Sequence, residues 1–182
     1  MPSDLQLNDL SQNIEFVSPG YGEFMKEACA VCLDLNGHES GVSMVSKDDI
    51  AGDFRVVWAP PVDDALRTSH GDKEETAEYA AYAIALLLVR QSTEFKYVER
   101  SMKGTRFDYR LGKTKDELFQ NKACLEVSGI LRGTEPQIAS RLTQKLQQVK
   151  KRDSGDLAFV VIVEFGRPIS RVKRHDRNTK AA

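Results

Sequence analysis

The chain has few cysteines, few histidines and no long apolar run, and each shortage excludes a class of protein. Three cysteines in 182 residues are too few for the disulfide framework of a small secreted domain. The histidines, His38, His70 and His175, are scattered, which argues against a histidine-driven hydrolase. The longest apolar stretch, residues 79–89, is much shorter than the roughly 18 residues of a membrane span. The first residues are polar, unlike a signal peptide, so we expect a cytoplasmic protein with no membrane partner.

The composition indicates one ordinary folded core with little net charge. Apolar residues make up 41% of the chain and charged residues 29%, enough for a buried core under a solvated surface. The net charge is −1, so the total charge gives no indication of a nucleic-acid partner. The distribution is uneven, because residues 167–182 carry six lysines and arginines against a single acid, Asp176. This basic tail either neutralises phosphates or is a solvated, poorly ordered end, and the sequence leaves both open.

The first 70 residues predict a polar arm and then a β-rich extension. Residues 1–20 are polar and end in Ser-Pro-Gly, which is typical of an arm outside the core. Apolar side chains alternate along residues 29–35, and the Asn-Gly pair at 36–37 is typical of a type I′ hairpin turn. We therefore expect a β-hairpin extension within residues 21–70, which extends the sheet or mediates contact with a second copy of the chain.

Residues 71–166 predict the order helix, strand, strand, strand, helix, strand. Asp72 and Glu75 form a capping box that begins a long apolar helix, which should end near Gln91. Pro136 begins the second helix. The expected strands are residues 95–100, 105–111, 123–131 and 157–165. Because a strand–helix–strand crossover makes a parallel pair, the fold class is mixed α/β: a central mixed β-sheet flanked by helices.

Two acids on neighbouring predicted strands are candidates for chemistry. Asp108 lies on the same face of its predicted strand as Arg106 and Arg110. On the next strand, Glu126 lies on the same face as Ser128. If the two strands are neighbours, both carboxylates project from the same side of the sheet, where Mg²⁺ or Mn²⁺ could bind between them. The structural alternative is that each acid pairs with an arginine of its own or a neighbouring strand.

The order of elements, with an Asp-bearing hairpin and a Glu-x-Ser strand, resembles the restriction-endonuclease-like superfamily, whose motif is written PD-(D/E)xK. The resemblance covers residues 72–165. It implies that Asp108 is the first acid and Glu126 the second, both as metal ligands, with Glu75 or Glu78 as an accessory acid. The activity implied is metal-dependent cleavage of DNA phosphodiesters.

Two positions depart from that motif. Phe107 stands where the motif has proline, and Ser128 stands where it has the lysine that orients or activates the attacking water. A serine supplies no positive charge, so Lys103 or Lys122 would have to substitute.

The resemblance also implies that the helix beginning at Pro136 contacts the substrate with the side chains of Gln137, Arg141 and Lys145. Two functions are then open. The first is a metal-dependent nuclease of a bacterial defence or mobile-element system, with a catalytic set of Asp108, Glu126, Ser128 and Lys103. The second is a non-catalytic module of the same fold, a protein- or nucleic-acid-binding subunit of a larger complex, which the loss of the motif lysine favours.

Overall fold

The computed structural model describes residues 2–15, 17–102, 104, 107–115, 123–151 and 157–176. Within them, eight strands form one mixed sheet in the order β1-β3-β2-β8-β7-β6-β5-β4. The strands are β1 (Ser3–Gln6), β2 (Val42–Asp48), β3 (Gly52–Val57), β4 (Tyr97–Arg100), β5 (Tyr109–Gly112), β6 (Ala123–Ile130), β7 (Leu157–Glu164) and β8 (Ile169–His175). The helices are α1 (Asp9–Gln12), α2 (Pro19–Asp34), α3 (Asp64–Ser69), α4 (Lys73–Ser92) and α5 (Glu135–Lys150).

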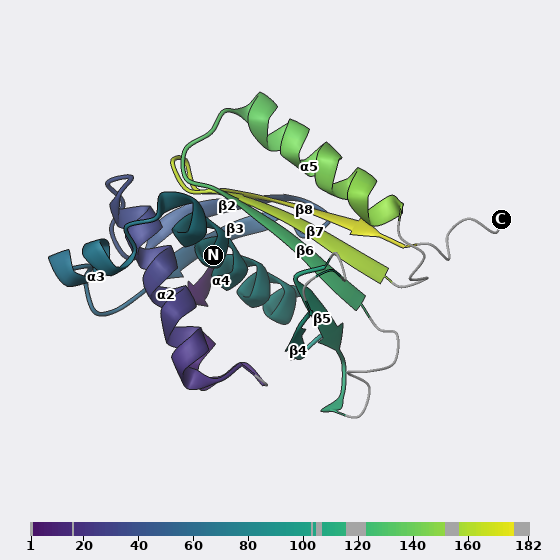
Figure 1. The fold of residues 1–182 in the computed structure, drawn as a ribbon, viewed down its shortest axis with the longest axis horizontal. Coiled ribbons are helices and arrows are strands. Elements are labelled where there is room, and N and C mark those ends of the chain that lie inside the picture. The colour runs from purple at the N-terminus through teal and green to yellow at the C-terminus, as the bar shows by residue number, and fades with distance from the viewer. Residues whose placement is uncertain are drawn as a thin grey trace.

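Helices cover both faces of this sheet, as Figure 1 shows: α2 and α4 lie on one face and α5 on the other. The central strand β7 serves both layers. Val161 packs in the layer of α2 and α4, whereas its neighbours Val160 and Ile162 pack against Ile138 of α5. Strands β6 and β7 are parallel, with α5 as their crossover, so the expected mixed sheet flanked by helices is confirmed. No helix in the described part of the chain has the length and hydropathy to cross a membrane.

The strand predicted across residues 29–35 is wrong, because this segment is the second half of α2. The oxygen of Ser18 accepts the Tyr21 N–H at 3.4 Å, and Pro19 occupies the first turn, so the helix begins with ordinary capping signals. The segment is almost completely buried, and a helix buried on every side shows no amphipathic period. Gly37, with φ +76°, lies in the turn after the helix rather than in a hairpin.

The predicted arm and basic tail contribute strands to the same sheet. From the arm, β1 pairs in parallel with β3, and Leu5 and Leu7 are fully buried. From the tail, β8 lies between β2 and β7, and both Arg171 and Lys173 form ion pairs with Asp48. These segments therefore have no local signal strong enough to reveal them, since their pairing partners are far away in the sequence.

An ion pair of Asp48, the last residue of β2, makes the stability of the fold depend on pH. Hydrogen bonding from Arg171 is the main cause that lowers the pKa of Asp48 below its ordinary value of 3.8. Because the pKa is lower in the folded state, this pair stabilises the fold above pH 3.8, and the contribution is lost as the pH falls through the folded-state pKa. Asp48 has φ +75°, which asparagine tolerates, so Asp48→Asn should keep the backbone. Urea unfolding should show it less stable than wild type at neutral pH, with a difference that narrows as the pH falls below 3.8. A difference that stays the same as the pH falls would contradict this.

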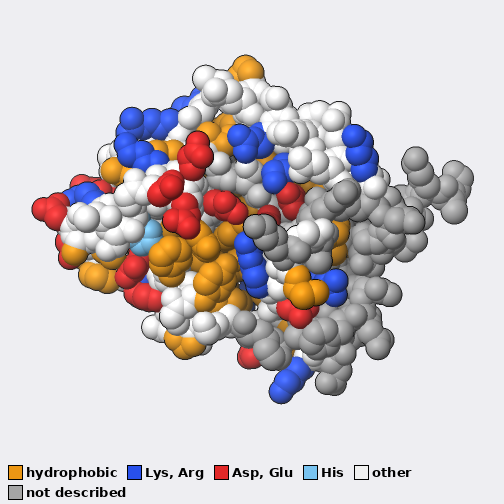
Figure 2. Space-filling model, viewed as in Figure 1, with side chains coloured by type: hydrophobic (Ala, Val, Ile, Leu, Met, Phe, Trp, Pro, Cys, Tyr) orange, Lys and Arg blue, Asp and Glu red, His pale blue; other side chains and the backbone are white. Residues whose placement is uncertain are grey.

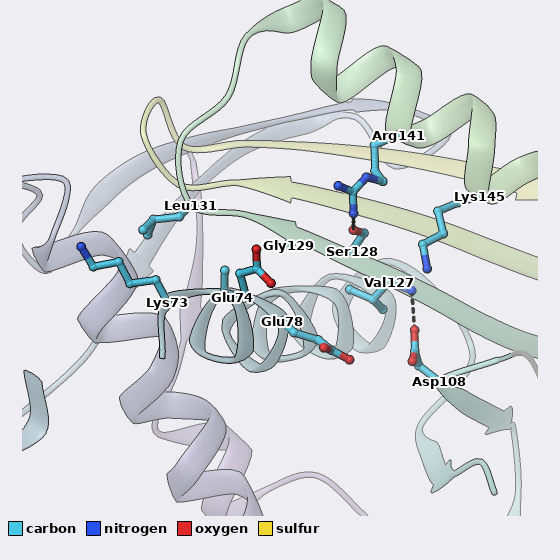
Figure 3. Close-up of a pocket in the computed structure, with 11 residues that line it drawn as sticks. Lys73, Glu74, Glu78, Asp108, Val127, Ser128, Gly129, Leu131, Arg141 and Lys145 are labelled. Carbon is cyan, nitrogen blue, oxygen red and sulfur yellow. Dashed lines mark hydrogen bonds between the residues drawn. The ribbon is translucent and has the colours of Figure 1, made fainter. Parts of the chain in front are cut away.

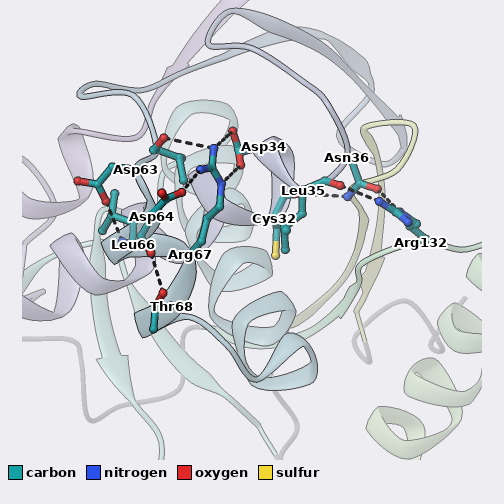
Figure 4. Close-up of polar contacts among 11 residues, drawn as sticks. Cys32, Asp34, Leu35, Asn36, Asp63, Asp64, Leu66, Arg67, Thr68 and Arg132 are labelled. Atoms are coloured by element: carbon teal, nitrogen blue, oxygen red, sulfur yellow. Dashed lines mark hydrogen bonds and ion pairs between the residues drawn. The ribbon is translucent and has the colours of Figure 1, made fainter.

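The C-terminal end of α2 fixes where α5 begins (Figure 4). Arg132, in the connector from β6 to α5, donates to the Asn36 side-chain oxygen at 2.7 Å. Asn36 in turn donates to the Leu131 carbonyl at 3.2 Å. On the other side, Arg67 of α3 pairs with Asp34 at 2.8 Å. The connector is therefore tied to the sheet's opposite layer before α5 crosses the sheet.

Candidate functional site

A cleft opens where β5 separates from β6. Strand β5 pairs with β6 only as far as Leu125, whereas β6 continues beside β7 to Ile130. In the described residues the outer edge of β6 beyond Leu125 thus has no partner strand. Helix α4 lies on one side of this edge and α5 on the other, and the cleft between them has a volume of about 420 Å³.

One wall of the cleft is mainly acidic and the other is basic. Glu74 and Glu78 of α4 and Asp108, just before β5, line the first wall together with one cation, Lys73. Arg141 and Lys145 of α5 line the second. In Figure 3 Glu78 and Asp108 point toward each other, and the two cations extend from α5 toward β6. Figure 2 shows acidic side chains gathered on this face of the molecule, with lysine and arginine side chains beside them.

Asp108 lies at the strand edge and continues the sheet with its side chain. Its backbone N–H donates to the Leu125 carbonyl at 3.0 Å. Its Oδ2 accepts the Val127 N–H at 2.8 Å. In a continuous β-ladder, a backbone carbonyl of the partner strand would accept this N–H. Its Oδ1 accepts the hydroxyl of Tyr82, on α4, at 3.0 Å. Each carboxylate oxygen has two lone pairs, so both keep room for another ligand.

The Tyr82 hydroxyl joins Asp108 to Glu78. It contacts the Glu78 carboxylate, one helical turn earlier on α4, as well as Asp108 Oδ1. Arg100 lies 4.6 Å above the Tyr82 ring, donates to its hydroxyl at 3.3 Å and stands 3.7 Å from Asp108 Oδ1. Burial, and next the hydrogen bond to Glu78, raise the pKa of Tyr82 well above its ordinary value. The hydroxyl is therefore a permanent donor at neutral pH.

Glu126 is held by the other helix. It is buried, with 5% of its surface exposed, and accepts the Lys145 ammonium at 2.6 Å. Two residues later, Ser128 accepts from Arg141 at 3.0 Å. Strands β5 and β6 are neighbours, as predicted. The Asp108 carboxylate, however, is hydrogen-bonded to Tyr82 of α4 and the Glu126 carboxylate to Lys145 of α5, on the opposite face of the sheet. The expectation that both carboxylates project from the same side is therefore wrong, whereas cation binding by either acid stays a prediction.

Arg141 and Lys145 of α5 lie near position 128, where the motif has lysine and this chain has serine. Residues 126 and 128 face the same way on β6, about 7 Å apart. Arg141 and Lys145 are one helical turn apart, about 6 Å. Because these spacings match, each cation meets one side chain of the strand. The charge that Ser128 cannot supply is thus present beside it.

The other predicted site residues have separate positions. Lys103 and Lys122 lie outside the described residues. The side-chain oxygen of Gln137 accepts the Thr134 N–H at 2.8 Å and caps α5. Of the helix acids, Glu78 and not Glu75 lines the cleft.

Sequence reasoning missed Tyr82 and Arg100. Tyr82 lies within the long apolar helix predicted after Asp72, and that prediction does not mark it as part of a site. The available signal was its i,i+4 spacing from Glu78, which places the two side chains on one face of α4. For Arg100 no comparable signal exists, because its partners come from a helix and another strand.

The acid pair suits a hard cation in an open site. One hydroxyl has one hydrogen, so Tyr82 can donate to only one of Glu78 and Asp108 at a time, and a cation between the carboxylates would satisfy the other. Mg²⁺ is commonly bound by one or two carboxylates, waters and substrate phosphates. Within the described ranges no group of three or more His, Cys, Asp or Glu side chains is arranged around a metal site. Glu78 and Asp108 are side chains of this cleft that could hold such a cation together with waters.

Comparison of the chain with models of protein families, with curated proteins and with solved structures gave no match. What bears on function is the cleft itself: three carboxylates on the α4 side, two cations on the α5 side, and an open strand edge between them.

Proposed function

We propose that the chain is a divalent-cation-dependent phosphodiesterase that acts on DNA. One observation supports this most: Glu78 and Asp108 face Arg141 and Lys145 across a single cleft. Phosphodiester hydrolysis uses both kinds of group, because the anionic substrate must be held and further negative charge develops on the phosphate. The resemblance to the PD-(D/E)xK superfamily likewise implies acids beside a cation, but with Glu126 as the second metal ligand and Glu78 as an accessory acid.

Each side chain has its own role in this proposal. Arg141 meets a serine hydroxyl rather than a carboxylate in the described structure, so its planar guanidinium binds a phosphate oxygen. Lys145 neutralises charge on the phosphate, and the buried Glu126 fixes its position. Asp108 and Glu78 hold Mg²⁺ or Mn²⁺, which, when bound, lowers the pKa of a coordinated water and stabilises negative charge on the phosphate.

Asp108→Asn tests this function directly. The amide keeps the size of the side chain but removes the charge that holds the cation. We expect the wild type to take up Mn²⁺ in calorimetry and to cleave plasmid or single-stranded DNA with Mg²⁺ or Mn²⁺ but not with EDTA. In Asp108→Asn the cation affinity and the cleavage rate should fall by at least about 100-fold.

The matched control is Asp53→Asn, which neutralises an exposed aspartate of β3, on the far side of the sheet from the cleft. It should bind Mn²⁺ and cleave as the wild type does. A wild type that gives no heat with Mn²⁺, or equal heat from wild type and Asp108→Asn, would remove the cation site from this cleft.

A second function, a non-catalytic nucleic-acid- or protein-binding module, has one observation in its favour. Glu126 and Ser128, at the motif positions, are already engaged by Lys145 and Arg141. This function predicts DNA binding in EDTA that Asp108→Asn leaves unchanged and Arg141→Gln weakens. Mobility-shift titrations of these two variants therefore distinguish the two functions.

A further inference from the structure

We infer that Tyr82 is a positioning residue that sets the spacing of the two carboxylates and keeps Arg100 from hydrogen-bonding to the Asp108 carboxylate. The inference rests on the proposed cation site at Glu78 and Asp108. Those acids come from different elements, and Asp108 is 26 residues from Tyr82 in the sequence. Their shared contact in this site is one tyrosine hydroxyl. The geometry of the pair therefore depends on where that oxygen is held.

The Tyr82 ring is held firmly. It is buried, with 1% of its surface exposed. The rings of Tyr79 and Tyr109 meet it edge to face, with centroids 5.7 Å and 5.2 Å away. Arg100 covers the ring at 4.6 Å. Because a ring packed on several sides has one orientation, its hydroxyl is a fixed point to which both carboxylates are attached.

Arg100 explains why the hydroxyl matters for charge as well as for distance. Its guanidinium donates to the Tyr82 hydroxyl at 3.3 Å and to the Asp108 backbone carbonyl at 3.4 Å. It forms an ion pair with Asp108 Oδ1 at 3.7 Å, a contact too long for a hydrogen bond. Without the hydroxyl, the guanidinium can close this distance, and a hydrogen-bonded ion pair with the Asp108 carboxylate would compete more strongly with a bound cation.

The experiment is Mn²⁺ calorimetry on the full chain as wild type, Tyr82→Phe and Tyr79→Phe. Both substitutions remove one hydroxyl from α4 and keep the ring, but only the Tyr82 hydroxyl contacts the acid pair among the hydrogen bonds of the described residues. We expect Tyr82→Phe to weaken Mn²⁺ binding about tenfold, as is typical when a group supporting metal ligands is removed. Tyr79→Phe should match the wild type within about twofold.

Thermal unfolding in EDTA separates positioning from stability, and each outcome has one meaning. A lower melting temperature of Tyr82→Phe with unchanged Mn²⁺ affinity overturns the inference, and so does an equal loss of affinity in Tyr79→Phe. A wild type that binds no Mn²⁺ overturns the proposed function itself.

If Tyr82→Phe does not fold, Arg100→Gln tests the competition. Removing this half-exposed charge should raise Mn²⁺ affinity by at least about fivefold, which is the effect of two unit charges about 4 Å apart in water. A fall in affinity would overturn the inference.

Discussion

Gly129→Ala is expected to lower the free energy of unfolding by about 3 kcal/mol, the upper end for an overpacked core site. Gly129 lies on β6 directly under α4, and an added Cβ would stand 1.9 Å from the Ala77 carbonyl oxygen and 3.2 Å from the Ala81 Cβ. The close atom is backbone, so no side chain can rotate away and α4 itself has to move. For a chain of this size the melting temperature should fall by about 6–12 °C.

The same substitution should affect the cleft, because Ala77 is followed by Glu78 on α4. A displaced helix moves Glu78 away from Asp108, so the folded fraction of Gly129→Ala should bind Mn²⁺ more weakly than the wild type. Gly20→Ala is the control, since a Cβ there meets nothing within 4 Å. It should unfold at or slightly above the wild-type urea concentration. Equal urea midpoints for Gly129→Ala and wild type would show that α4 does not depend on this close approach.

The parts of the fold that the sequence predicted have strong local signals. Asp72 caps α4 with its side chain, accepting the N–H groups of Glu74 and Glu75, and Pro136 lies in the first turn of α5. The continuous apolar run of β7 is buried on both faces, as its composition indicates. In each case the information lies within the element, so no distant partner is needed to recognise it.

The parts of the fold that the sequence did not predict depend on contacts between residues far apart in the chain. Residues 29–35 are apolar at alternating and at helical positions, and full burial in α2 removes the polar face that would decide between them. Strand β1 has only four residues, and its pairing of Ser3 with Phe54 carries no signal in the local sequence. Short edge strands of this kind become visible only when the rest of the sheet is in place.

The candidate site was predictable in its elements but not in its contacts. The sequence predicted neighbouring strands around Asp108 and Glu126, and the pairing of β5 with β6 confirms that these strands are neighbours. It also predicted that Asp108 lies within a strand, whereas β5 begins at Tyr109. This shift frees the Asp108 side chain to bind Val127 and Tyr82 at the strand edge. The start of a strand within one residue is set by tertiary contacts, which no pattern in the chain records.

Glu164→Gln is expected to lower the free energy of unfolding by about 3 kcal/mol, because the buried Glu164 carboxylate accepts hydrogen bonds from two loops. Glu164 has 1% of its surface exposed. Its Oε1 accepts the Gly133 N–H at 3.1 Å and the Gly166 N–H at 2.8 Å, and its Oε2 accepts the Arg167 N–H at 2.9 Å. Gly133 belongs to the connector before α5, and the other two to the turn between β7 and β8. One side chain thus joins the start of the cation-bearing helix to the sheet.

A glutamine in this position is nearly isosteric, but its amide nitrogen donates and cannot accept. Whichever way the amide turns, at least one of the three N–H groups loses its acceptor and faces another donor, and the negative charge that strengthened all three bonds is gone. Urea unfolding of Glu164→Gln against Glu39→Gln, an exposed glutamate, measures this, and the control should stay within about 0.5 kcal/mol of wild type. A Glu164→Gln chain as stable as the control would mean that water satisfies these N–H groups and that the contacts of Arg132, Asn36 and Arg167 suffice to hold the connector before α5.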